Sequence, residues 1–176
     1  MSSLAHLKSI IERKSGAPTL QCPLESFRTQ FGFDATAMRR DGFDPSTIEL
    51  HEQFFGRLES FAGHPLIGEY LKTLTPTESY QASGVWVASF QQIRDSAFGQ
   101  GGPESELFPH GYISIAGSVG GNNVSLHFPS GRVVWADHER TSDIIDGKVQ
   151  VLSEDIKTFL TDLLEDKLEQ QLDKLD

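Results

Sequence analysis

The chain has 176 residues, of which 38% are hydrophobic and 23% charged, and its formal net charge is −10. This length suits one domain with its own hydrophobic core, and the composition excludes a disordered protein. A net negative charge repels phosphate backbones and anionic lipids, so nucleic-acid and membrane binding are not expected. The charge favours a basic protein partner, or alternatively only maintains solubility.

The N-terminus does not have the pattern of a secretory signal, because no basic start precedes a continuous apolar region. No apolar run approaches the ~20 residues that cross a bilayer. Cys22 is the only cysteine, which excludes an internal disulfide and a cysteine-based zinc site. A cytoplasmic location is therefore expected.

The first predicted helix has Ser3 as its N-cap and ends at Gly16 and Pro18. Its apolar residues share helical spacing and form one stripe: Leu4, Leu7, Ile10 and Ile11. Residues 15–45 mix glycine, proline and aspartate with aromatic side chains, which indicates an irregular segment. Four phenylalanines are expected to attach this segment to the core: Phe27, Phe31, Phe33 and Phe43.

A second helix is predicted to start near Asp44 or Ser46. Asp44 would place Pro45 at the first helical position, whereas Ser46 and Glu49 have the spacing of a capping box. Gly63 and Pro65 are predicted to end it, and a short helix over residues 66–74 follows. Its apolar face consists of Phe54, Phe55, Leu58 and Phe61.

The central part of the chain is predicted to be a sheet. A short strand over 85–88 leads into a helix that Ser89 and Gln92 cap reciprocally, and a polar loop occupies 99–106. Next come β-branched and aromatic runs separated by turn residues, which predict an antiparallel meander over 112–115, 124–128 and 133–135. Trp86 and Trp135 are expected to be core or half-buried residues, with a binding groove as the alternative.

After the meander, a charged loop is predicted over 137–147 and a brief strand over 149–152. Ser153 is expected to cap a final helix of about five turns. Its apolar residues keep helical spacing: Ile156, Phe159, Leu160, Leu163, Leu164, Leu168, Leu172 and Leu175. Its last half carries charges around single leucines, so it is expected to protrude or to pair with another copy as a homodimer.

No group of residues has the spacing of a known catalytic or metal site. Asp137 and His138 could act in acid–base catalysis, but neighbours on a strand point to opposite faces. His110, His127 and His138 do not have a ligand spacing. The glycines of residues 117–121 precede a strand and not a helix, which favours a turn over a phosphate site. No catalytic residue, cofactor or metal is therefore expected.

Several short motifs occur in a characteristic order over residues 80–165: the strand and helix of Val85 to Ile93, Leu107-Phe108-Pro109, Gly120-Gly121-Asn122, Gly131, Trp135-Ala136-Asp137-His138, and the closing helix with Ile156, Phe159 and Leu160. This order resembles the SUKH superfamily, which includes fungal cell-wall assembly regulators and many bacterial immunity proteins. The resemblance implies an α+β fold with a central antiparallel sheet flanked by helices.

The resemblance also implies one SUKH-like domain over residues 1–176. Residues 1–79 would be a divergent helical part, 80–165 the sheet core with its closing helix, and 166–176 a charged helical end. The implied function is non-enzymatic and intracellular: an immunity protein that neutralises a cognate toxin, or alternatively a regulatory or scaffold protein. The predicted contacts with a basic partner are loop acids that flank the meander: Glu104, Glu106, Asp137, Glu139, Asp143 and Asp146. A hydrolase that uses His138 is the third hypothesis.

Overall fold

The computed structural model describes residues 3–21, 27–60, 65–97 and 103–175. A six-stranded antiparallel sheet forms its centre, and the strands follow one another across the sheet in chain order. They are β1 (Tyr80–Ala82), β2 (Val85–Val87), β3 (Tyr112–Gly117), β4 (Asn123–His127), β5 (Arg132–Ala136) and β6 (Gln150–Ser153). The predicted α+β class with a central antiparallel meander is confirmed.

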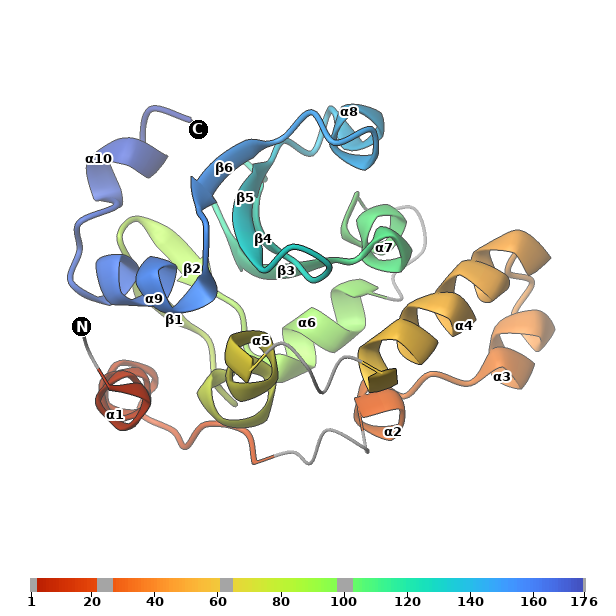
Figure 1. Cartoon of the computed structure of the whole chain (residues 1–176), viewed down its shortest axis with the longest axis horizontal. Helices are drawn as coiled ribbons and strands as arrows, with labels where there is room; N and C mark the ends of the chain where they lie inside the picture. The colour runs from red at the N-terminus through yellow and green to blue at the C-terminus, as the bar shows by residue number, and fades with distance from the viewer. Residues whose placement is uncertain (1–2, 22–26, 61–64, 98–102, 176) are drawn as a thin grey trace.

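Helices surround this sheet on both faces (Figure 1). Those before the sheet are α1 (Leu4–Ser15), α2 (Phe27–Phe31), α3 (Ala35–Arg40), α4 (Pro45–Ser60), α5 (Pro65–Glu69) and the π-helix η2 (Tyr70–Leu74). The later ones are α6 (Phe90–Ala97), α7 (Pro103–Leu107), the 3-10 helix η3 (Phe108–His110), α8 (Thr141–Ile145), α9 (Ile156–Leu164) and α10 (Glu169–Leu172). No helix in the described ranges has the length and apolar character needed to cross a membrane.

The two faces of the sheet have different covers, because successive strand residues alternate between them. Ile113, Val124 and Val133 belong to the main core, which also includes residues of α1, α6 and α9. On the opposite face, a smaller cluster joins strand residues to α7 and α8: Tyr112, Val134, Ala136, Leu107 and Ile144. This second cluster contains no residue of β1 or β2, and Trp86 of β2 is 53% exposed.

The turns of the meander form where glycines were predicted to form them. Between β3 and β4, the Ser118 N–H donates to the Asn122 carbonyl at 2.8 Å, and Gly121 has a φ of 89°. Between β4 and β5, the Gly131 N–H donates to the His127 carbonyl at 2.8 Å. Gly121 has the left-handed conformation that other residues rarely adopt, which explains its place in the turn.

The N-terminal part is more helical than the sequence suggested. Helix α1 is confirmed with Ser3 as N-cap and Gly16 as a left-handed C-cap. The prediction of an irregular segment over 15–45 is wrong where α2 and α3 form. Asp34 starts α3 by accepting hydrogen bonds from the Thr36 and Ala37 backbone N–H groups at 2.8 and 3.1 Å. Phe31 is buried, as predicted.

Helix α4 begins at Pro45 because Asp44 caps it. The Asp44 carboxylate accepts the Ser46 N–H at 2.8 Å, so the Asp44 alternative is correct. Phe55 is buried, as predicted for the apolar face, whereas Phe61 lies outside the described residues. The short helix predicted over 66–74 is confirmed as α5 followed by η2.

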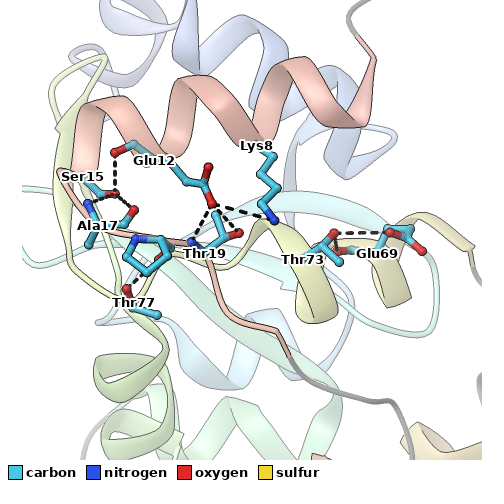
Figure 2. A network of polar contacts seen from close by, with 9 residues as sticks. Lys8, Glu12, Ser15, Ala17, Thr19, Glu69, Thr73 and Thr77 are labelled. Carbon is cyan, nitrogen blue, oxygen red and sulfur yellow. Dashed lines mark hydrogen bonds and ion pairs between the residues drawn. The ribbon is translucent and has the colours of Figure 1, made fainter.

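A polar network ties the segment after α1 to the segment before β1 (Figure 2). Glu12 accepts the Thr19 N–H at 3.2 Å and lies 3.8 Å from the Lys8 ammonium. The Thr77 hydroxyl donates to the Pro18 carbonyl at 2.6 Å. The network fixes residues 17–19 against the chain that leads into the sheet.

Two predicted loops contain helices. Residues 103–106 belong to α7, with Pro103 at its first position, and residues 141–145 form α8. Both helices have only five residues, too few for helical periodicity to be recognisable. The rest of the first predicted loop, residues 99–102, lies outside the described residues.

The prediction of one long C-terminal helix is wrong. Helix α9 starts after Asp155, whose carboxylate accepts the Thr158 N–H at 2.8 Å, and not after Ser153. It ends at Leu164, and Asp166 then adopts a φ of 55° that reverses the chain. Leu168 and, in α10, Leu172 are buried in the main core, so this end does not protrude.

Replacing Tyr80 by phenylalanine is expected to leave stability unchanged or to raise it by up to about 1 kcal/mol. Tyr80 is 4% exposed, and its hydroxyl has no hydrogen-bond partner among the described residues. Burial raises the pKa of Tyr80 well above its ordinary value, so the hydroxyl stays protonated. Urea unfolding measures the change in the free energy of unfolding.

Tyr112→Phe is the matched control for this prediction. The Tyr112 hydroxyl donates to the Ile144 carbonyl at 3.1 Å, so the variant loses a hydrogen bond that Tyr80 does not have and should cost about 1 kcal/mol. A larger loss from Tyr80→Phe than from Tyr112→Phe would contradict the packing described for Tyr80.

Candidate partner-binding surface

The two tryptophans occupy different environments. Trp135 is 6% exposed and belongs to the main core, as predicted, whereas Trp86 is 53% exposed and is not a core residue. Trp86 lies on β2 between Val85 and Val87, which are both buried. Alternation turns Trp86 toward the opposite face, where residues of α7 and α8 cluster with residues of β3 and β5 but not with Trp86.

Trp86 borders a hollow of about 210 Å³ that we call the Trp86 groove. It lies between the strands β2 to β4 and the helices α6 and α7. The residues that line it are Trp86, Ala88, Gln92, Ser96, Glu104, Ser114, Ala116, Gly117 and Asn123. Large exposed aromatic side chains beside a hollow are typical of binding surfaces.

Strand register explains why the hollow forms beside Trp86. Trp86 pairs with Gly117, and Gly117 pairs with Asn123, so these three residues form one row across β2, β3 and β4. The glycine contributes no side chain, which leaves a gap between the indole and the asparagine. A register shift between Ser114 and Ala116 marks a β-bulge here, and bulges often redirect side chains near functional sites.

A chain of hydrogen bonds fixes Glu104 above the sheet. The Ser114 hydroxyl donates to Asn123 Oδ1 at 3.1 Å, and Asn123 Nδ2 donates to Glu104 Oε1 at 3.1 Å. An ionised carboxylate only accepts hydrogen bonds, so the amide nitrogen of Asn123 must face Glu104. The acid on α7 is thereby held in the groove by residues of β3 and β4.

Helix α6 supplies the polar wall of the groove. The predicted reciprocal cap is confirmed, since the Ser89 N–H donates to Gln92 Oε1 at 2.9 Å and the Gln92 N–H donates to Ser89 Oγ at 3.3 Å. The Ser96 hydroxyl donates to the Ile93 carbonyl at 3.0 Å. Gln92 and Ser96 are four residues apart, so they lie on the same side of the helix.

The predicted contact acids do not form one cluster. Of the six, only Glu104 lines the Trp86 groove. Glu106 faces α8 instead, where it accepts the Thr141 hydroxyl at 3.0 Å. Figure 1 shows α7 and α8 side by side, so the two loops that flank the meander do come together at one end of the molecule.

The remaining acids belong to the α8 region and have basic neighbours. Asp137 lies 3.6 Å from Arg140, while Asp143 and Asp146 lie 2.8 and 3.8 Å from Lys148. The hydrogen bond and positive charge of Lys148 lower the pKa of Asp143 below its ordinary value. Glu139 is exposed. A second hollow, of about 350 Å³, lies here between Trp135, Asp137, Asp143, Lys148 and Leu175 among others.

The histidines of the meander, His127 and His138, contact different residues and do not come together in one site. The His138 N–H donates to Asn122 Oδ1 at 3.2 Å, and its Nδ1 lies 3.0 Å from the same oxygen. His127, predicted to be exposed, is half-buried because its ring stacks on Tyr112 at 4.4 Å. Desolvation lowers the pKa of His127, with a smaller contribution from Arg132. Within the described ranges, no three potential metal ligands gather at one place.

Most groove residues were not singled out from the sequence. Gln92 was named only as a helix cap, and Ser96, Ser114 and Gly117 were not expected to act together. The detectable signal was Val85-Trp86-Val87, because an aromatic residue between two β-branched apolar residues points away from the face that they bury. Strand β1 was also missed, since it has only three residues.

Comparisons with known proteins did not place the chain in a family. It matches no family model, no curated protein and no solved structure.

Proposed function

We propose that this chain is a non-enzymatic, intracellular protein-binding domain that contacts its partner through the Trp86 groove. The most concrete form of the proposal is an immunity protein that neutralises a cognate toxin by covering its active site. The observation that carries it is the exposed indole of Trp86 beside a polar hollow in the sheet surface.

The size of the groove favours a protein partner. Pockets for small-molecule ligands usually enclose roughly 300–1,000 Å³. The Trp86 groove measures about 210 Å³ and is open, which suits one side chain of a partner better than a whole cofactor. Tryptophan is also among the residues whose truncation most weakens protein interfaces.

The charge of the chain supports a basic partner. Its formal net charge is −10, and opposite charge accelerates and orients the encounter of two proteins. Toxins that cleave nucleic acids need a basic substrate groove, so an acidic inhibitor complements them. The SUKH resemblance of residues 80–165 supports the same function.

A regulatory or scaffold protein of the cell-wall-assembly-regulator type is the alternative. The gene neighbourhood distinguishes the two, because a toxin gene next to this gene would support immunity. Full biological activity of a His138→Ala variant would exclude the third hypothesis, a hydrolase that uses His138.

Trp86→Ala is expected to weaken partner binding by about 30-fold or more, which corresponds to a loss of about 2 kcal/mol at an interface hot spot. The purified chain serves as bait in a pull-down from its native host, and the recovered protein is then titrated calorimetrically against each variant. The midpoint of thermal unfolding should change little, because Trp86 is 53% exposed and lies outside the main core.

Gln81→Ala is the matched control for the Trp86 variant. Gln81 is exposed and pairs directly with Trp86 across β1 and β2, but it does not line the groove. Its variant should bind the partner as the unchanged chain does. Equal binding by both variants would contradict the proposed contact surface, and recovery of a small molecule without any protein would contradict the proposed function.

A further inference from the structure

We propose that the Trp86 groove receives an arginine side chain of the partner, whose guanidinium group stacks on the Trp86 indole and pairs with Glu104. This inference rests on the proposed function and adds the chemical group that the groove recognises. Three properties of the groove support it: its charge, the orientation of its hydroxyl groups and the shape of its floor.

Among the described residues of the groove, one side chain carries a charge and has no counter-ion. Glu104 is the single ionisable side chain among the described residues that line it. Its Oε1 atom accepts the hydrogen bond from Asn123. Its Oε2 atom has no hydrogen-bond or ion-pair partner in the part of the chain that the structure describes. A partly buried carboxylate of this kind favours a cation, because charge-assisted hydrogen bonds are stronger than neutral ones.

The two serine hydroxyls of the groove offer acceptors and not donors. The Ser96 hydroxyl donates its hydrogen to the Ile93 carbonyl, and the Ser114 hydroxyl donates its hydrogen to Asn123 Oδ1. Each hydroxyl has one hydrogen and two lone pairs, so what remains for a ligand is lone pairs. Together with Glu104 Oε2 they suit a group with several donors.

Arginine fits this arrangement better than lysine does. A guanidinium group is planar, has five N–H donors and can stack on an aromatic ring while it donates in its own plane. Tryptophan is the aromatic residue that attracts cations most strongly. A lysine ammonium is a compact, strongly hydrated charge that cannot stack in this way.

The floor of the groove leaves room for the stacked group. Gly117 lies between Trp86 and Asn123 in their cross-strand row. A Cβ atom at Gly117 would meet Asn123 Oδ1 at 3.8 Å, an ordinary contact, and Gly117 does not have a positive φ. A larger residue can therefore be placed there, and its side chain would occupy the space assigned to the guanidinium.

The first test uses the full chain and the peptide acetyl-Gly-Arg-Gly-amide as the probe. The indole N–H signal of Trp86 is followed by NMR, with the buried Trp135 as the internal reference. A saturable shift of the Trp86 signal is expected, and the peptide with lysine in place of arginine should bind several-fold more weakly. Absence of a saturable shift, or equal binding of the lysine peptide, overturns the inference.

Two variants test separately the charge of Glu104 and the free space beside Trp86. Glu104→Gln keeps an acceptor for Asn123 but removes the charge, and should weaken binding of the arginine peptide about tenfold. Gly117→Val should abolish binding by filling the space beside Trp86. Glu106→Gln is the control, because it removes the same charge from the same helix but faces Thr141 outside the groove. Equal losses from Glu104→Gln and Glu106→Gln overturn the inference.

Failure of this inference can be told apart from failure of the proposed function. If Trp86→Ala abolishes binding of the natural partner and Glu104→Gln does not, the protein-binding function stands and the arginine assignment is wrong. If free arginine binds more tightly than the blocked peptide, the groove is a small-molecule site and the docking proposal is wrong. Loss of partner binding from both variants, with Gln81→Ala unaffected, supports both proposals.

Discussion

Replacing Phe108 by alanine is expected to lower the free energy of unfolding by about 3–5 kcal/mol, the usual cost of removing a buried aromatic ring. Phe108 lies in η3 and is 1% exposed. Its ring centroid is 5.5 Å from that of Phe31 and 5.9 Å from that of Phe55. These contacts attach α2 and α4 to the start of β3, so the variant should loosen the N-terminal helices.

Urea unfolding followed by far-UV circular dichroism measures this loss. Because most domains have a total stability of only about 5–15 kcal/mol, Phe108→Ala can approach complete unfolding. Phe108→Leu keeps the prediction testable, since it leaves a smaller cavity and should cost clearly less than the alanine variant. A loss below about 1 kcal/mol from Phe108→Ala would mean that the aromatic cluster does not form as described.

Replacing Leu172 by alanine is expected to cost about 2–4 kcal/mol. Leu172 lies in α10, is 3% exposed and belongs to the same core as Leu7 of α1. A solvated, protruding helix end predicts almost no effect at this position, because exposed leucines contribute little to stability. The variant therefore distinguishes the folded-back end from the protruding one.

Gln171→Ala is the matched control for Leu172→Ala, since Gln171 is the preceding residue and is exposed. Its free energy of unfolding should stay within about 0.5 kcal/mol of the unchanged chain. Each variant is measured at two protein concentrations. A loss at Leu172 that grows as the chain is diluted would show that this leucine packs against a second copy and not within its own chain.

The meander could be predicted because its signals are local. Gly121 and Gly131 have positive φ angles that glycine adopts without cost, and the apolar runs between them alternate as strands do. The caps at Ser3 and at Ser89 with Gln92 were equally readable, since a cap involves residues three positions apart. These features need no information about distant parts of the chain.

The end of the chain shows why helical spacing alone was insufficient. Ile156 to Leu172 keep the spacing of one continuous helix, yet the helix stops at Leu164 and Asp166 reverses the chain. The Asp166 carboxylate accepts the Ser83 N–H at 3.3 Å, and the Ser83 hydroxyl donates to the Leu163 carbonyl at 2.9 Å. These partners lie about eighty residues away in the sequence, so their effect on the helix cannot be read locally.

The candidate site depended even more on distant contacts. The acidic residues were found by charge, but whether an acid faces a groove, a hydroxyl or a lysine depends on what α7 and α8 pack against. Glu104 and Glu106 are two residues apart and contact Asn123 and Thr141 respectively. Glu104 and Glu106 were treated as equivalent in the sequence, because a helix of five residues is too short for its periodicity to predict which way each side chain points.

The sequence by itself determined the α+β class, the antiparallel meander and its turns, because backbone conformation at glycines and two-residue alternation are properties of neighbouring residues. Only the tertiary structure decided that Trp86 is exposed, that Gly117 opens a hollow beside it and that α10 folds back on the core. Exposure depends on which distant elements cover a residue. Trp86 is 53% exposed and belongs to neither of the two hydrophobic clusters of the sheet.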